Sequence, residues 1–159
     1  MLKVIRSGIY MNKRFCLVGM FAFLNFAASC ILYAQSAQVI DQMLKTQSLT
    51  CADACYLAGI MAGKVQDDTP QVDALEMFRN IKGIEKAKPD DLIRYDVFAA
   101  LIMDAGEVKA SIWYNLYRTP HYAFRYIKME GLVGEATPPS SNVNPRDALA
   151  IISKLSEVK

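Results

Sequence analysis

Apolar residues recur at the spacing of an α-helix in several separate segments of this chain. In the run from Asp91 to Gly106, positions 97, 98, 101, 102 and 105 are apolar and fall on one side of a helix. Asp91 can cap the start of this helix, Asp96 falls in the first turn, where the helix dipole favours a carboxylate, and Gly106 follows the last apolar residue. The pattern predicts a capped helix whose buried side includes Phe98, Leu101 and Ile102.

The same arrangement occurs twice more. Upstream, an apolar run follows Asp53 and stops at Gly63, and Thr50 and Asp53 have the spacing of a capping box. Downstream, a further apolar run follows Asp147. When the three runs are aligned on Asp53, Asp96 and Asp147, the sequence predicts three versions of one helix.

A different helix precedes each of the two later copies. A helix predicted from Gln71 to Lys82 ends at Gly83, and a helix that Pro120 opens ends at Gly131. A short helix over residues 38–45 would supply a reduced partner for the first copy. The sequence therefore predicts one all-α domain of three helix-loop-helix units, at about residues 38–63, 71–106 and 120–159.

The first 37 residues have the composition of a secretory leader. They contain four basic residues and no Asp or Glu, and a largely apolar run without charge covers residues 15–34. We expect a signal peptide or lipoprotein leader over residues 1–37 and an exported domain over residues 38–159, in the periplasm or cell envelope. Without the leader, 14 basic residues stand against 16 acidic ones, so no basic excess remains for nucleic-acid binding.

Three fates of the leader remain open. The chain can be cleaved after Ala34 or Ala37, it can carry a lipid on Cys30, or it can keep an uncleaved anchor. Met11 is an alternative start to Met1. Contact with a membrane is expected only through such a lipid or anchor.

Aromatic and basic residues are densest from Glu107 to Thr119 and in the helix that follows. Trp113 and Tyr117 could stack on sugars or on a partner, and Arg118 could hold an anion. The competing interpretation is that rings at helical spacing fill the core of a small helical protein, and the spacing favours it.

Few groups in the sequence would support catalysis or metal binding. Cys51 and Cys55 lie one turn apart on one predicted helix, where a mutual disulfide is disfavoured, and we interpret them as buried packing residues. His121 stands alone beside a helix start, and no GxSxG, HExxH or paired CxxC pattern is present. We expect no catalytic residue, no cofactor and no metal.

The segment HYAFRYIKMEGLVGEATPPSSNVNPRDALAIISKL resembles the S-layer homology (SLH) repeat. In that repeat a helix beginning near His-Trp-Ala ends at Gly-Ile or Gly-Val, and a loop leads to a Thr-Arg-Ala-Glu-Phe helix. Two further segments are similar to this repeat. The similarity covers the whole repeat in ALEMFRNIKGIEKAKPDDLIRYDVFAALIM and its second half in LTCADACYLAGIMAG. The resemblance implies a pseudo-three-fold domain that attaches exported proteins to cell-wall glycan or peptidoglycan.

In the family, the Arg of Thr-Arg-Ala-Glu helps to bind acidic wall sugars. Aligned on the acidic residues, Arg94 takes this position in the middle unit, Cys51 and Pro145 take it in the others, and Arg146 follows Pro145. We therefore expect a non-catalytic envelope module that binds glycan; the alternative is an adaptor for another envelope protein, with glycan binding lost. The candidate ligand-binding residues are Arg94, Arg146, Trp113, Tyr117 and Arg118.

Overall fold

Helices form the framework of residues 37–108 and 112–157, which are the residues that this computed structural model describes. A first helical segment covers residues 37–43. The later helices are α2 (Cys51–Met61), α3 (Gln71–Met77), α4 (Tyr95–Ala105), α5 (Ile112–Tyr117), α6 (Pro120–Met129) and α7 (Pro145–Glu157). No β-strand occurs in the described ranges, so the all-α prediction is confirmed. Residues 1–36 of the predicted leader, including Cys30 and Ala34, lie outside them.

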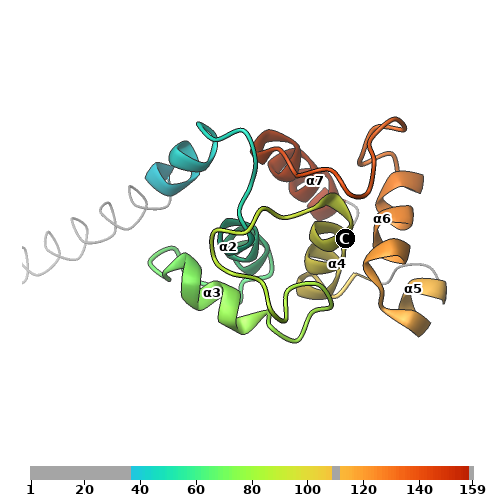
Figure 1. The fold of residues 1–159 in the computed structure, drawn as a ribbon, viewed down its shortest axis with the longest axis horizontal. Helices are drawn as coiled ribbons and strands as arrows, with labels where there is room; N and C mark the ends of the chain where they lie inside the picture. The colour runs from blue at the N-terminus through green and yellow to red at the C-terminus, as the bar shows by residue number, and fades with distance from the viewer. Residues whose placement is uncertain (1–36, 109–111, 158–159) are drawn as a thin grey trace, which may run out of the picture.

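Two helices, α2 and α4, occupy the centre of the molecule (Figure 1). Helix α3 packs against α2, α6 packs against α4, and α2 also contacts α4 and α7. Helix α5 packs against α6, and together they form one end of the molecule, opposite the helical segment 37–43 (Figure 1).

The core lies where α2 and α4 meet. Phe98, Leu101 and Ile102 of α4 are fully buried, as predicted. Cys51 and Cys55 of α2 are buried free thiols, which confirms their interpretation as packing residues. Burial raises the pKa of the Cys55 thiol to about 12, so it stays neutral at physiological pH.

Three extended segments meet at the centre through a closed cycle of backbone hydrogen bonds. The N–H of Leu49 donates to the carbonyl of Val143 (2.8 Å), the N–H of Val143 to that of Ile93 (3.0 Å), and the N–H of Ile93 to that of Leu49 (3.0 Å). All three side chains are buried. Each residue lies two positions before the first residue of a helix, so the cycle joins the starts of α2, α4 and α7.

Two loops close the amino-terminal ends of the central helices in the same way. The first two N–H groups of α2 donate to the carbonyls of Asp91 (2.7 Å) and Pro89 (3.2 Å). The first two N–H groups of α4 donate to the carbonyls of Ser141 (3.0 Å) and Pro139 (3.1 Å). Backbone donors that the start of a helix leaves unpaired are thereby satisfied by the loop before α4 in the case of α2 and by the loop before α7 in the case of α4.

The start of α4 differs from the prediction. The helix begins at Tyr95 with Arg94 as its N-cap, and Asp91 is not the cap. Asp91 belongs instead to the preceding loop, where its side chain accepts the N–H of Lys88 (2.7 Å) and its carbonyl binds α2. These tertiary and turn hydrogen bonds leave Asp91 outside the helix.

The alignment on three acidic residues is also wrong by one position in the middle unit. Asp53 and Asp147 are the third residues of α2 and α7, whereas Asp96 is the second residue of α4. The capping pair is confirmed in α2, since the N–H of Asp53 donates to Oγ1 of Thr50 (3.2 Å). Backbone pairing at the centre, and not the position of a carboxylate, sets the register of the helices.

The remaining helices follow the predictions in part. Helix α6 begins at Pro120 as expected, and Gly83 and Gly131 have positive φ angles (100° and 67°), which suits their predicted role as stops. Helix α3 ends at Met77, earlier than the predicted Lys82, and turns lead from there to Gly83. Helix α5 was not predicted.

Candidate functional site

A groove of about 400 Å³ lies beside the starts of α2 and α4. Buried Cys51 and Val97 contribute to its lining, together with the loop that joins α3 to α4. Lys86 and Arg94 bring positive charge to this lining and are exposed. Lys86 was not among the predicted site residues, because nothing in the sequence indicates that its loop reaches this groove.

Arg94 is held at the groove by a carboxylate of its own helix. Its Nε and Nη2 atoms donate to the two oxygens of Asp96 at 3.0 and 2.6 Å. This hydrogen bond, and the charge of Asp96, raise the pKa of the Arg94 guanidinium above its ordinary value. The pairing orients the guanidinium and partly offsets its charge, which limits the field that it presents to a ligand.

The helix starts place the three aligned residues differently. Cys51 and Pro145 are the first residues of α2 and α7, whereas the first residue of α4 is Tyr95. Arg94 is the N-cap of α4, so relative to its helix it lies one position earlier than Cys51 and Pro145 do.

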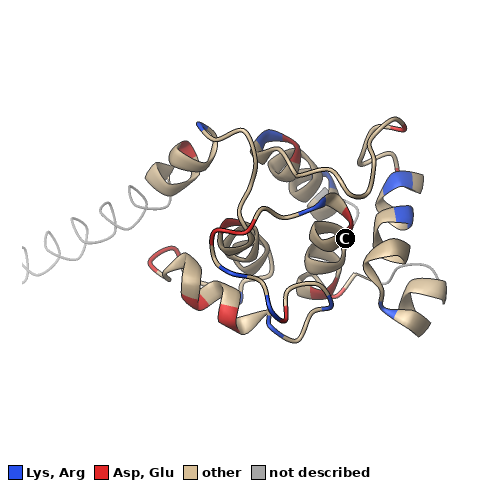
Figure 2. Ribbon diagram, in the orientation of Figure 1, with Lys and Arg blue, Asp and Glu red and all other residues tan. Residues whose placement is uncertain are grey.

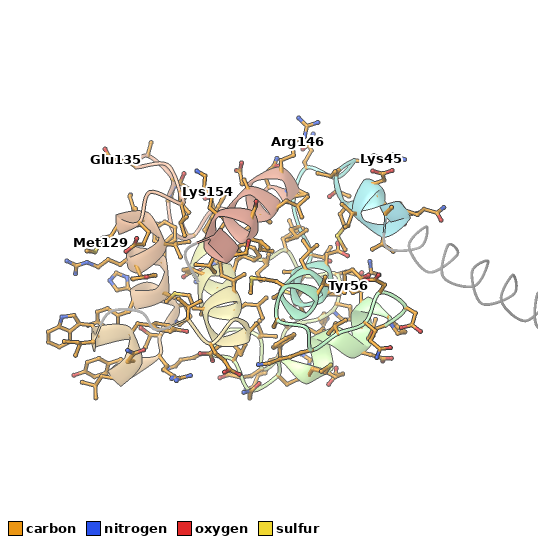
Figure 3. The ribbon with its side chains drawn as sticks, turned by 180° about the vertical axis from the view of Figure 1, so that it is seen from behind. Lys45, Tyr56, Met129, Glu135, Arg146 and Lys154 are labelled. Atoms are coloured by element: carbon orange, nitrogen blue, oxygen red, sulfur yellow. The ribbon has the colours of Figure 1, made fainter. Side chains whose placement is uncertain are left out.

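The five predicted ligand-binding residues do not form one site. Arg94 and Arg146 lie at the starts of α4 and α7, and Arg146 points away from the body of the protein (Figure 3). Trp113, Tyr117 and Arg118 lie on or directly after α5. The 11 residues of α4 span about 16 Å, and α5 is fixed to the far end of that helix, so the two groups are separated by its length.

Tyr114 and Arg118 fix α5 to the end of α4. The buried Tyr114 hydroxyl lies 3.3 Å from the carbonyl of Ala100 and 3.2 Å from Oδ1 of Asp104. Arg118 Nη1 donates to the same carboxylate oxygen at 2.9 Å. Burial and the charge of Asp104 raise the pKa of Tyr114, so its hydroxyl remains a donor. Arg118 therefore helps to hold α5 on α4, while its side chain stays 65% exposed.

The other rings of α5 are on the surface. Trp113 and Tyr117 are 59% and 54% exposed, so the prediction that they fill the core is wrong, although it holds for Tyr114 and Phe124. The ring centroids of Trp113 and Tyr117 lie 6.4 Å apart with an 8° angle between planes, and Tyr117 lies 5.7 Å from Tyr122. The rings form a continuous aromatic row from α5 to α6.

The described residues provide little for metal chemistry. Within residues 37–108 and 112–157 there is no group of three or more His, Cys, Asp or Glu side chains that could hold a metal ion. None of the helices in these ranges is long and apolar enough to cross a membrane. The groove and the aromatic row are the candidate binding features of this part of the chain.

Comparison of the chain with protein-family models, with curated proteins and with solved structures gives no significant match.

Proposed function

We propose that the protein is an exported, non-catalytic module of the cell envelope, built of three SLH-like units, which attaches to cell-wall glycan or peptidoglycan. The observation that carries this proposal is the hydrogen-bond cycle of Leu49, Ile93 and Val143. A cycle of three equivalent bonds is expected if three related units surround a pseudo-three-fold axis, as the resemblance implies.

The loops support the same arrangement. The loop before α4 binds the start of α2, and the loop before α7 binds the start of α4, through carbonyls at matching positions. At the start of α7, which is the third equivalent position, the Asn144 side chain donates to the carbonyl of Gln47, in the segment before α2, at 3.5 Å. Pro145 has no N–H to offer there, so a weaker side-chain contact replaces the backbone pair.

The groove combines charged donors, charged acceptors and apolar surface, which are the groups that a sugar site uses. Lys86 and the oriented Arg94 provide cationic donors, and the exposed Leu92 provides an apolar surface for a sugar ring. Glu85 and Asp91 also line the groove and would accept hydrogen bonds from sugar hydroxyls. Cys51 at the family arginine position is neutral, because burial raises its pKa, so binding in this proposal depends on Lys86 and Arg94.

Cosedimentation with purified peptidoglycan and with wall preparations that retain their secondary polymers tests the proposal. We expect the protein to pellet with at least one preparation, and the Lys86→Ala/Arg94→Ala double variant to lose most of that retention. Lys154→Ala, which removes an exposed lysine from α7, is the matched control and should pellet as the unchanged protein does. If no preparation retains the protein, or if the double variant is retained equally, glycan binding in this groove is wrong.

Export is a separate part of the proposal and depends on the leader. Intact mass of the protein purified from cell envelopes would distinguish a diacylglyceryl group on Cys30 from cleavage after Ala34 or Ala37. A full-length mass in the cytoplasmic fraction alone would contradict export.

A protein-interaction adaptor is the second candidate, and one observation favours it. Thr and Glu of the family's Thr-Arg-Ala-Glu have capping-box spacing, which would make Arg the first helical residue, and none of α2, α4 and α7 has Arg as its first residue. The adaptor predicts that crosslinked envelopes yield one specific protein partner, whose recovery falls in the Lys86→Ala/Arg94→Ala variant, while no wall preparation retains the protein. Wall retention that depends on these two residues would contradict it.

A further inference from the structure

The outer surface of α5 and α6 exposes large apolar side chains. We call this the α5–α6 face, and it consists of Ile112, Trp113, Leu116, Tyr117, Tyr122, Arg125, Lys128 and Met129. Ile112, Leu116 and Met129 are 82%, 67% and 75% exposed. Isolated exposed apolar residues are ordinary, but a short helix that exposes four large ones in six residues, next to a fifth on its packing partner, indicates an interaction surface.

The face is continuous across the two helices. Trp113 and Tyr117 stack along α5, and Tyr117 stacks on Tyr122 at the start of α6. Tyr122, Arg125 and Met129 follow at i, i+3 and i+7, which places them on one side of α6. Met129 lies at the outer edge of that helix (Figure 3).

The charged residues of the face itself, Arg125 and Lys128, are both basic. No Asp or Glu occurs between residues 108 and 129 of the sequence, and the exposed Glu130 directly follows Met129. Arg125 is exposed, and Lys128 lies 5.9 Å from the centre of the Phe124 ring. Figure 2 shows basic residues along α6. Arg118 is offset by Asp104, so Arg125 and Lys128 provide the basic rim.

We propose that the α5–α6 face binds the surface of an anionic phospholipid membrane. Trp and Tyr prefer the boundary between lipid headgroups and acyl chains, aliphatic side chains enter the acyl region, and Lys and Arg attract anionic headgroups. The face combines these three components on one surface.

Charge argues against the other occupants. In a symmetric dimer the basic rims would face one another, and the apolar leader segment is itself preceded by four basic residues. A glycan would use the rings but would leave Ile112, Leu116 and Met129 exposed to water. This contact goes beyond the proposed function, since the groove lies at the opposite end of α4.

Trp113 gives a local readout, because it is the only Trp in the chain. The full-length protein is mixed with vesicles of phosphatidylglycerol or of phosphatidylcholine, and Trp113 emission and its quenching by brominated lipid are recorded. A leader that inserts by itself also favours phosphatidylglycerol, because it carries four basic residues, but it does not bury Trp113. We expect a blue shift and quenching with phosphatidylglycerol, at a lipid concentration on the order of tenfold lower than with phosphatidylcholine.

Variants separate the apolar and basic components. Leu116→Glu and the double variant Arg125→Glu/Lys128→Glu should each raise the lipid concentration at half-maximal shift by on the order of tenfold or more. Met77→Glu alters an apolar residue on α3 that is 51% exposed, and it should change nothing. Circular dichroism of each variant checks that the fold is retained.

Three outcomes would overturn the proposal. Trp113 emission that no vesicle shifts would exclude a lipid contact at this face. An equal shift with both lipids, unaffected by Arg125→Glu/Lys128→Glu, would exclude anionic headgroups as the ligand. A shift with soluble peptidoglycan fragments but not with phosphatidylglycerol would assign the face to glycan.

Discussion

At the scale of single residues, the ends of the helices show where sequence and structure disagree. Gly63 and Gly131 follow the ends of α2 and α6 with φ angles of 65° and 67°. At the end of α4 the glycine comes one residue earlier: Gly106 is the C-cap with φ −80°, and the left-handed position falls on Glu107, with φ 53°. A side chain at positive φ is strained, so Glu107 lowers the stability of the folded protein in a way that glycine at this position would not.

Glu107→Gly is therefore expected to stabilise the protein. Release of the strain should outweigh the extra entropy of glycine by about 0.5–1 kcal/mol in the free energy of unfolding, measured by urea denaturation. The ion pair with Lys64 that would be lost is long, at 3.6 Å, and mostly solvent-exposed, so its loss should have little effect. Glu130→Gly is the control, because Glu130 caps α6 at φ −76°, where glycine brings no relief. If both substitutions destabilise equally, the positive φ of Glu107 carries no strain.

Helical spacing predicted burial correctly in α4 but not in α5. Phe98, Leu101 and Ile102 are buried as their spacing predicts. Trp113 and Tyr117 share that kind of spacing but lie on the surface, since the side of α5 that faces α4 is occupied by Tyr114. Aromatic residues at helical spacing lie on one side of a helix. Only the tertiary structure shows whether another helix covers that side.

At the scale of secondary-structure elements, Tyr95 joins α4 to α7. It is buried, and its hydroxyl donates to Oδ2 of Asp147 at 2.6 Å. Burial, followed by the hydrogen bond and charge of Asp147, raises the pKa of Tyr95 from its ordinary value near 10 to about 12. Neither residue was expected to pair with the other, because the contact joins helices that lie far apart in the sequence.

The raised pKa predicts how this contact depends on pH. Below pH 10 the hydroxyl is protonated in both states, and the hydrogen bond contributes fully to the folded state. Between pH 10 and 12 the unfolded chain loses this proton before the folded one does, so the contribution falls as pH rises.

Tyr95→Phe should lower the free energy of unfolding by about 1 kcal/mol near neutral pH. The difference between the two proteins should shrink as the pH rises from 10 toward 12, which chemical denaturation at a series of pH values would measure. Tyr117→Phe, on an exposed residue, is the control and should show no such trend. A difference that stays constant up to pH 12 would contradict the role given to Tyr95.

At the scale of the whole molecule, the cycle of Leu49, Ile93 and Val143 brings three chain segments together. Ile93 is 1% exposed, whereas the adjacent Leu92 is 49% exposed. Ile93→Ala keeps the backbone N–H and carbonyl of the cycle but leaves a cavity where the segments meet.

We expect Ile93→Ala to cost about 2–5 kcal/mol in the free energy of unfolding, and Leu92→Ala to cost less than about 1 kcal/mol. Equilibrium unfolding followed by far-ultraviolet circular dichroism provides the comparison. If the cycle is a structural centre, the Ile93 variant should unfold in a single transition at lower denaturant. Equal effects of the two substitutions would show that this position is not part of the core.

The sequence by itself determined the helical class, most of the helices and the buried side of α4, because helical periodicity and capping are properties of neighbouring residues. Thr50, Pro120, Gly83 and Gly131 marked boundaries that the structure keeps. Only the tertiary structure decided the register at the start of α4 and the exposure of Trp113. Both depend on hydrogen bonds and packing between segments distant in the chain, and local pattern contains no information on which of those segments meet.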